Sequence, residues 1–290
     1  MHSTERRTWR ARARQPSGRA ALVDHLRRGL HFTWISLKVL AHDANLLVLP
    51  FLALISMGFV WMLVVLSVWA LGPPPQSPSS AFLYYEIFAA YLITWILSVY
   101  FMTAIVGATQ ARLRGEKPMA AEGIRIANAC LLRLLPWALA AATVGVVLRL
   151  LSLRWEIAGR AVTRMFGYPW AIATVFVLPA MALEGAGPVR GVHRSRELLH
   201  EIWGSRQAGL MGTGIVFGIL ALLGLVPLLW GLLDPAAPHL LAVAVFYWLI
   251  LAVLWSVVHG ILVTALYHYA TESEASFGFS WQALNHPWAR

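Results

Sequence analysis

Residues 45–71 read NLLVLPFLALISMGFVWMLVVLSVWAL and contain no charged side chain. A bilayer core of about 30 Å is crossed by about 20 apolar residues in a helix, so this stretch is long enough to span a membrane. Further stretches share its apolar character, at residues 81–109, 134–152, 167–184, 208–233 and 238–269. The sequence therefore predicts an all-α, polytopic membrane protein with six transmembrane helices.

The composition supports a membrane protein without a separate soluble domain. Hydrophobic residues make up 59% of the 290-residue chain and charged residues 12%, about half the charged fraction of a soluble domain. We expect a disordered basic tail at 1–20, one membrane domain at 21–270 and a polar tail at 271–290. The basic residues behind the net charge of +10 lie mainly outside the spans. Membrane orientation and anionic lipid headgroups explain them better than nucleic acid does.

Residues 22–42 predict an amphipathic helix at the membrane interface. Its apolar stripe is expected to consist of residues at helical spacing, namely Val23, Leu26, Leu30, Trp34, Leu37 and Ala41. The predicted contacts with anionic lipid headgroups are Arg27, Arg28 and Lys38. Residues 119–133 and 150–166 are expected to form similar helices. The fourteen tryptophans of the chain are interpreted mainly as a belt at the two interfaces.

The distribution of Lys and Arg predicts the orientation of the spans. Basic residues are concentrated in the N-terminal segment and in the connectors 112–133 and 190–206, whereas the turns 72–80 and 234–238 carry none. Cytoplasmic loops of membrane proteins are enriched in Lys and Arg, so we expect both termini on the cytoplasmic side. The arginines between Arg149 and Arg164 fall on the outer side in this arrangement and are its weakest part.

Ionisable side chains inside a span are candidates for function, because a charge in hydrocarbon is costly. Glu86 and Arg149 lie near the outer ends of their spans. We expect them to be interface anchors or one structural ion pair, with a substrate or ion site as the alternative. His259 lies in the sixth span. It is expected to be a hydrogen-bonded packing residue, with proton relay as the alternative.

Glu184 ends the predicted fourth span and precedes a basic helix. We expect its carboxylate to pair with Arg190 or Arg194 at the cytoplasmic face. Such a pair would fix the end of the span, and the alternative is again a polar site within the membrane. Glu184 and Arg194 therefore join Glu86, Arg149 and His259 as candidate intramembrane polar residues.

The sequence carries none of the catalytic signatures that a membrane enzyme would need. It has no HExxH, GxSxG or Walker motif and no Gly-Asp pair within a span. His193, Glu197 and His200 are spaced for a metal ion, but a solvated helix face explains them better. We therefore expect no enzymatic activity, no metal and no cofactor.

Several short motifs are found along the chain. They are Leu40-x-x-Asp43-x-x-Leu46-Leu47-x-x-Pro50, Arg112-Leu113-x-Gly115-x-x-Pro118, Glu184-Gly185-x-Gly187-Pro188 and Ala265-Leu266-Tyr267-x-Tyr269-Ala270. Together they resemble a family of prokaryotic integral membrane proteins defined only as a domain of unknown function, over about residues 28–278. The helix from Gly187-Pro188 to Arg194-Ser195 is also similar, more distantly, to the membrane domain attached to some glycerophosphodiester phosphodiesterases. The resemblance implies a six-helix fold in a prokaryotic plasma membrane and supplies no activity.

Two functions remain open from the residues alone. The first is a non-enzymatic scaffold or assembly partner that binds anionic lipid, a cytoplasmic protein or a second copy of the chain. The alternative is a transporter or channel for a lipid-like or apolar small solute. Helices kinked at Pro50, Pro136, Pro169 and Pro179 would shape its cavity. A cavity that reaches Glu86, Arg149 or His259 would favour transport, whereas a closed core with an external groove would favour a protein partner.

Overall fold

The computed structural model describes residues 18–71, 80–117, 119–154, 168–202, 207–234 and 236–272. Within these ranges every regular element is a helix, which confirms the all-α class. The helical segments long and apolar enough to cross a membrane are Ala44–Ala70, Leu83–Leu113, Ala120–Val147, Gly212–Leu233 and His239–Glu272. Most of the two predicted tails and of the 150–166 segment lies outside the described residues.

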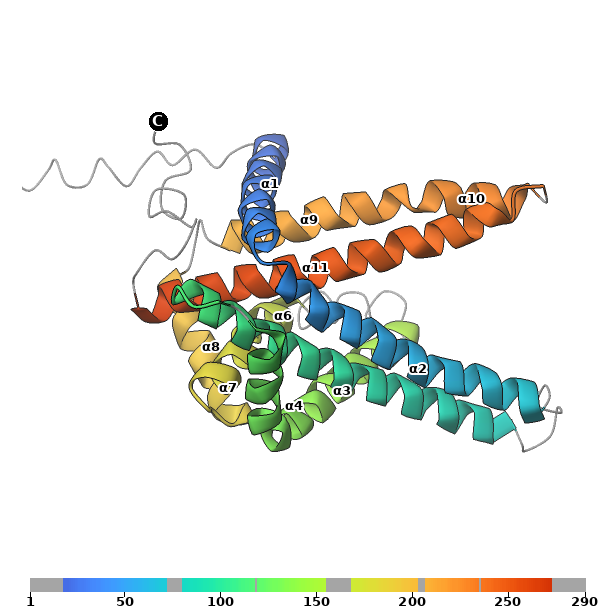
Figure 1. Cartoon of the computed structure of the whole chain (residues 1–290), viewed down its shortest axis with the longest axis horizontal. Helices are drawn as coiled ribbons and strands as arrows, with labels where there is room; N and C mark the ends of the chain where they lie inside the picture. The colour runs from blue at the N-terminus through green and yellow to red at the C-terminus, as the bar shows by residue number, and fades with distance from the viewer. Residues whose placement is uncertain are drawn as a thin grey trace, which may run out of the picture.

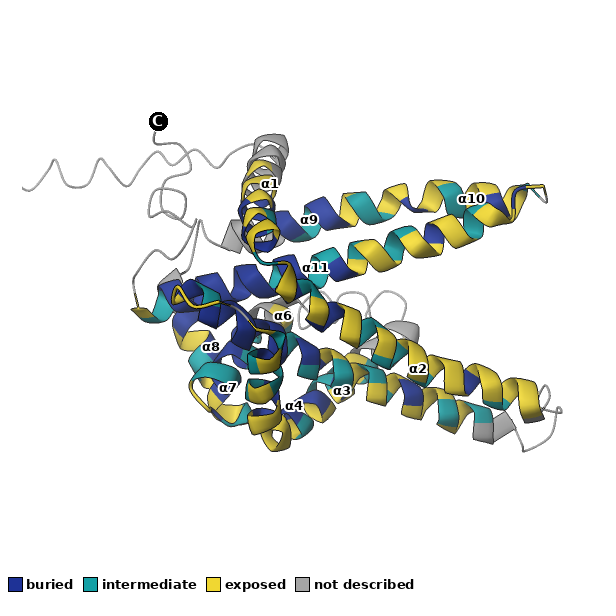
Figure 2. Cartoon of the chain, in the orientation of Figure 1, coloured by how far each residue is buried: buried dark blue, intermediate teal, exposed yellow. Residues whose placement is uncertain are grey.

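Two antiparallel helix pairs share a base and diverge from it, which gives the protein a V shape (Figure 1). One arm pairs α2 (Val48–Leu71) with α3 (Ser80–Leu113). The other pairs α9 (Gln207–Leu223) and α10 (Leu225–Leu233) with α11 (His239–Glu272). α3 and α11 contact each other where the arms meet. Buried residues are concentrated at this base, and exposed residues along the arms (Figure 2).

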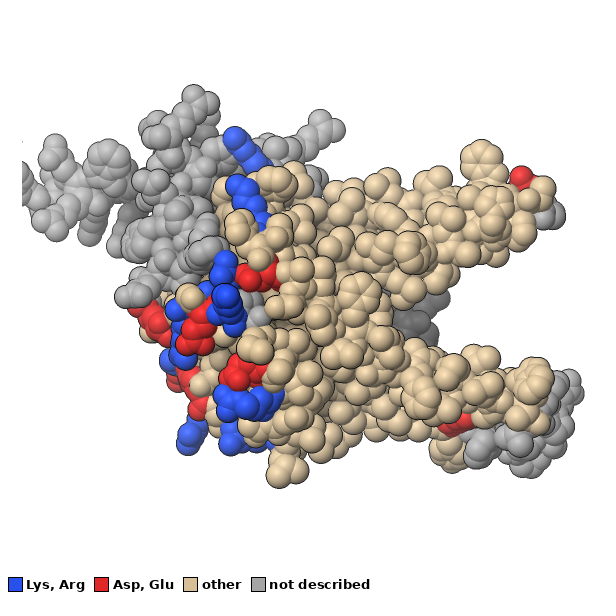
Figure 3. All heavy atoms as spheres, viewed as in Figure 1, with Lys and Arg blue, Asp and Glu red and all other residues tan. Residues whose placement is uncertain are grey.

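The base of the V is also the charged end of the molecule. Lys and Arg side chains gather there on the face shown in Figure 3, whereas the arms present mostly uncharged surface. Arg112, at the end of α3, lies 2.7 Å from Asp43, just before the short 3₁₀ helix η2 (Ala44–Leu47) that leads into α2. The ion pair therefore joins the two helices of one arm at the charged end.

Helix α1 (Gly18–His42) crosses the base at a steep angle to the spans (Figure 1). It packs against α9 and α11, and its closest approach is at Gly29. A Cβ atom on Gly29 would lie 2.1 Å from the carbonyl carbon of Gly212 in α9. Small residues allow helix backbones to come this close.

The buried face of α1 is not the stripe that the sequence pattern predicts. Leu30 and Trp34 of the predicted stripe are 57% and 59% exposed. The buried face consists instead of Phe32, Thr33, Ile35, Ser36, Val39 and Leu40. Exposure of Leu30 and Trp34 is compatible with a stripe that faces lipid, so the predicted place of α1 at the membrane interface stays a prediction.

Helix α4 (Ala120–Arg154) is one helix where the sequence predicts an interfacial segment and a separate span. Pro136 lies inside it and cannot donate to the carbonyl of Leu132. α4 bends along its length and continues (Figure 1), as helices often do at proline. Its first half packs on α3, where a Cβ atom on Gly123 would lie 2.3 Å from the carbonyl oxygen of Ala104.

The predicted fourth span at 167–184 is not a single helix. It consists of α6 (Tyr168–Ala173) and α7 (Val177–Leu183) with a turn between them, and neither is among the five segments that could cross a membrane. The predicted count of six is therefore wrong for the described part of the chain. Arg133 of α4 nevertheless donates to the carbonyl of Gly185 at 3.0 Å, so the chain is back at the charged end after α7.

The break between α6 and α7 has a chemical cause. Pro179 has no N–H to donate to the carbonyl of Val175. The backbone N–H of Phe176 is satisfied from outside the helix, by a 3.1 Å hydrogen bond to Oγ of Ser195 in α8 (Pro188–Ile202). Phe176 and Ser195 are both buried. Non-helical backbone at membrane depth is tolerated where protein buries and satisfies it.

The fifth span bends at Gly224, between α9 and α10. Two side chains of α11 donate to carbonyl groups just before the bend: Tyr247 to Leu220 at 2.6 Å and Trp248 to Ala221 at 3.0 Å. A Cβ atom on Gly224 would lie 2.4 Å from Nε1 of Trp248. The glycine therefore makes room for the indole that satisfies the bent backbone.

Candidate ligand-binding site

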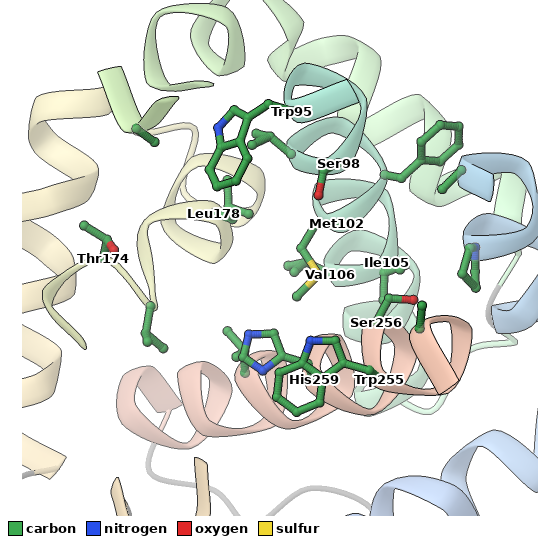
Figure 4. Close-up of a pocket in the computed structure, with 18 of the residues that line it drawn as sticks. Trp95, Ser98, Met102, Ile105, Val106, Thr174, Leu178, Trp255, Ser256 and His259 are labelled. Carbon is green, nitrogen blue, oxygen red and sulfur yellow. The ribbon is translucent and has the colours of Figure 1, made fainter. Parts of the chain in front are cut away.

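A cavity of about 750 Å³ lies where the two arms meet. Residues of α2, α3, α4, α6, α7 and α11 line it, and Figure 4 shows side chains from several of these helices turned toward the same space. Its volume falls within the range of about 300–1,000 Å³ that is typical of small-molecule sites. The site is thus built from both arms and from the broken fourth segment.

The walls of the cavity that the structure describes are mainly apolar and carry no charged side chain. Its polar lining side chains are Ser98, Thr174, Ser256 and His259, and none of the described lining residues is Lys, Arg, Asp or Glu. A buried ion without an opposite charge is strongly disfavoured. The cavity therefore suits a neutral, largely apolar molecule.

His259 is the lining residue with the most distinctive chemistry. Its ring points into the cavity from α11 (Figure 4) and stacks on Trp255, with ring centroids 4.9 Å apart and an interplanar angle of 20°. Within the described part of the chain its ring nitrogens have no hydrogen-bond partner. An unpaired polar group in apolar surroundings costs about 1–3 kcal/mol. The stacking on Trp255 gives His259 a packing role, its hydrogen bond stays a prediction, and a ligand can supply a partner for the ring nitrogens.

Two of the lining hydroxyls are already engaged with their own helices. Ser256 donates to the carbonyl of Val253 at 2.9 Å, and Thr174 donates to that of Trp170 at 2.8 Å. No hydrogen bond of this kind is recorded for Ser98 among the described residues. Among the described imidazole and hydroxyl groups of the lining, those of His259 on α11 and Ser98 on α3 are therefore still open to a ligand, besides the indole N–H groups of the lining tryptophans.

Four tryptophans line the cavity, although the sequence interpretation places most tryptophans in an interfacial belt. They are Trp95, Trp137, Trp170 and Trp255. Trp137 and Trp170 are stacked, with ring centroids 6.1 Å apart. The position of Trp255 offers a signal that the belt interpretation missed, because it lies in the middle of a 34-residue helix, far from either end.

Glu184 and Arg194 belong to a second polar cluster, at the charged end. Nε of Arg194 donates to Oε1 of Glu184 at 3.0 Å, and the hydroxyl of Tyr267 donates to the same oxygen at 2.5 Å. The hydrogen bond that Arg194 donates to Glu184 raises the pKa of Arg194. Of the two expected partners of Glu184, the ion pair is made by Arg194, whereas Arg190 is exposed. The cluster joins the end of α7 to α8 and α11.

Of the other predicted polar pair, Glu86 and Arg149, the structure describes only the side chain of Glu86. Glu86 is near the start of α3, at the far end of an arm, and does not line the cavity. Arg149 is part of α4, but its side chain lies outside the described residues, so the predicted pair stays a prediction. No group of three or more His, Cys, Asp and Glu residues in the described ranges is arranged to hold a metal ion.

The predicted headgroup contacts lie on α1, at the charged end. Nζ of Lys38 lies 5.5 Å from the ring centroid of Trp34, a cation–π contact. Lys38 and Arg27 are both exposed, and the side chain of Arg28 is outside the described residues. The exposed face of α1 thus combines apolar and basic side chains, as helices in the interface plane do.

These features define a polytopic helical membrane protein with an apolar cavity between two diverging helix pairs. The chain matches the model of a family of unknown function, DUF6159, over residues 81–277, more than half of its length, and it belongs to this family. The match covers α3 to α11 and begins later than residue 28, where the motif resemblance begins. No curated protein and no solved structure shows significant similarity to the chain. The distant likeness to glycerophosphodiester phosphodiesterase membrane domains receives no support from these comparisons.

Proposed function

We propose that this protein binds a lipid-like or apolar small molecule within the membrane and acts as its transporter. The observation that carries the proposal is the cavity of about 750 Å³, whose described walls carry no charge and include His259. A cavity that reaches His259 is the feature that separates transport from a closed scaffold. The proposal assigns no reaction and no cofactor to the protein.

The arrangement of the arms supports access from the bilayer. Figure 3 shows a hollow between the two arms that widens away from the charged end. The surfaces of the arms are apolar, with Phe59, Trp69 and Phe246 among the exposed side chains. An apolar molecule dissolved among lipid chains can therefore reach the base of the V without crossing water.

Broken helices beside the cavity support movement of its walls. Thr174 and Val175, in the turn between α6 and α7, line the cavity. Discontinuous helices commonly form the binding sites of membrane transporters, where irregular backbone meets the substrate. We place the charged end on the cytoplasmic side of a prokaryotic plasma membrane, following the enrichment of Lys and Arg there.

Filling the cavity tests the proposal. Gly145 lines the cavity, and a Cβ atom at this position meets nothing within 4 Å, so Gly145→Phe adds a ring without displacing backbone. Gly58 and Gly218 also have open space around a Cβ atom, but they lie outside the cavity, and Gly58→Phe and Gly218→Phe are the matched controls. Mass spectrometry of molecules that copurify in mild detergent should show an apolar species that only Gly145→Phe removes. Retention of every copurified species by Gly145→Phe would contradict the proposal.

A scaffold role is the second candidate, and one observation favours it. Exposed apolar side chains lie near the charged end, including Leu132 at 84% and Val189 at 74%, beside the basic side chains. Such a surface suits anionic lipid, a cytoplasmic protein or a second copy of the chain. Crosslinking through cysteines at positions 132 and 189 in intact membranes would identify a neighbour, and the absence of any crosslinked species would count against this role.

A further inference from the structure

We propose that the ligand of the cavity is a neutral amphiphile of the isoprenoid quinone class, held by a hydrogen bond from His259 to a quinone carbonyl. This inference rests on the proposed function and names the substrate class of the same cavity. It follows from the charge of the walls, the arrangement of the aromatic rings and the hydrogen-bonding groups left open.

The absence of charge on the described walls favours a ligand with an uncharged headgroup. A phospholipid would bring a phosphate into a space whose described lining residues include no Lys or Arg. A fatty acid would bring an unpaired carboxylate, which is equally disfavoured in such surroundings. A headgroup that is polar but uncharged avoids the free-energy cost of burying an unpaired charge.

The aromatic side chains of the cavity walls favour a ligand that contains a planar ring. The stacked pair of Trp255 and His259 projects from α11, and Trp95 projects into the same space from α3 (Figure 4). Aromatic side chains pack favourably against a second ring in offset or edge-to-face geometry. A planar quinone ring between these walls would use both helices, which an acyl chain alone would not.

The open hydrogen-bonding groups include donors that can serve an acceptor on the ligand. A neutral imidazole carries one N–H donor, so His259 can donate to a carbonyl without bringing a charge into the cavity. Ser98, on α3, supplies a second hydroxyl donor. A quinone ring has two carbonyl acceptors and no donor of its own, and its apolar tail fits the hollow between the arms.

Binding of a decyl-substituted benzoquinone to the full-length protein in detergent tests the inference. Quinones quench tryptophan fluorescence, and Trp95 and Trp255 are on the cavity walls. We expect saturable quenching that Gly145→Phe abolishes and Gly218→Phe preserves. Decylbenzene, decanol and a phosphatidylglycerol serve as competitors that lack the carbonyls, the ring and the neutral headgroup respectively. Each of the three should bind more weakly than the decyl-substituted benzoquinone and should therefore relieve its quenching only at high concentration.

Substitutions of His259 separate the hydrogen bond from the shape of the site. His259→Phe keeps a ring and should weaken quinone binding by about threefold to tenfold, the effect of one lost hydrogen bond. His259→Gln keeps an N–H donor and should bind within about twofold of the wild-type protein, provided that both variants elute as single species in gel filtration.

The results of these experiments distinguish a failure of the quinone assignment from a failure of the proposed transport function. If decylbenzene competes as well as the quinone and His259→Phe binds normally, the quinone assignment fails while the sensitivity to Gly145→Phe keeps the cavity as a binding site. If Gly145→Phe leaves the binding of every probe unchanged, the proposed function fails as well.

Discussion

The backbone N–H of Phe176 donates a hydrogen bond of 3.1 Å to the side-chain oxygen of Ser195. The two residues lie on either side of the turn at the charged end, one in the broken fourth segment and the other in α8. Through this contact a helix at the end of the molecule satisfies backbone that the break would otherwise leave unpaired at the edge of the cavity.

Removal of this hydroxyl should destabilise the protein. Ser195→Ala leaves the buried N–H of Phe176 without a partner, which costs about 1–3 kcal/mol. Thermal unfolding in detergent measures the loss. Ser56→Ala is the matched control, because Ser56 donates only to the carbonyl of Leu52 within its own helix and its loss should be nearly neutral. Equal stability of the two variants would show that the contact is unimportant.

The ion pair between Glu184 and Arg194 should couple energetically to Tyr267. Tyr267→Phe and Arg194→Met each remove one interaction with the same carboxylate oxygen. Because Glu184 and Arg194 are about one third exposed, solvent screening limits the effect, and each variant should lose about 0.5–1.5 kcal/mol. A double-mutant cycle should be non-additive. Arg190→Met, which removes an exposed arginine of the same helix, should have little effect.

The same pair predicts an absence of pH dependence on the basic side. Glu184 raises the pKa of Arg194. A raised pKa stabilises the folded state below the pKa of the unfolded group, and the contribution is lost only as the pH rises through the folded pKa. For arginine that loss lies far above neutral pH. The stability difference between the wild-type protein and Arg194→Met should therefore stay constant from about pH 7 to about pH 9 in unfolding measurements.

Docking of α1 should depend on Gly29. Gly29→Val would force side-chain atoms into the backbone of Gly212, where even a Cβ atom would come within 2.1 Å, and overpacking of this kind costs about 1–3 kcal/mol or more. Faster proteolysis within α1 and a lower unfolding temperature are expected. Gly58→Val, in open space on α2, is the control, and similar behaviour of both variants would refute a specific contact.

Anionic lipid should bind at the exposed face of α1 if the predicted headgroup contacts are right. Each basic residue near an anionic surface contributes about 1 kcal/mol, so the loss of the positive charge alone in Arg27→Glu or Lys38→Glu should reduce the affinity for phosphatidylglycerol about fivefold, and the added negative charge should reduce it further. Native mass spectrometry provides the readout. Arg114→Glu reverses an exposed charge outside α1 and controls for net charge. Unchanged lipid content in the α1 variants would rule out the site.

Hydrophobic length predicts the helical class and the places of the spans well, because it depends on the bilayer and not on neighbouring helices. The same measure fails at 167–184. Pro136 and Pro179 both lie in apolar stretches, yet the first bends a helix and the second accompanies a break. The difference depends on Ser195, a residue outside the apolar stretch that satisfies the open turn, and no local pattern reveals that partner.

The sequence predicts the candidate site only in part as well. A histidine inside a span identifies His259 as a residue of interest, because polar groups are costly there. The surrounding cavity depends on the angle between the two arms, which hydropathy does not contain. The face of α1 that contacts α9 cannot be predicted from the sequence for a related reason, since lipid and protein both accept apolar side chains. The close approach of Gly29 to Gly212 becomes visible only in the structure.

Helix α11 is unbroken from His239 to Glu272, and it carries both His259 and Tyr267. Eight residues of α-helix separate them, a rise of about 12 Å. One continuous helix therefore carries both the imidazole on the cavity wall and the phenol that contacts Glu184 at the charged end.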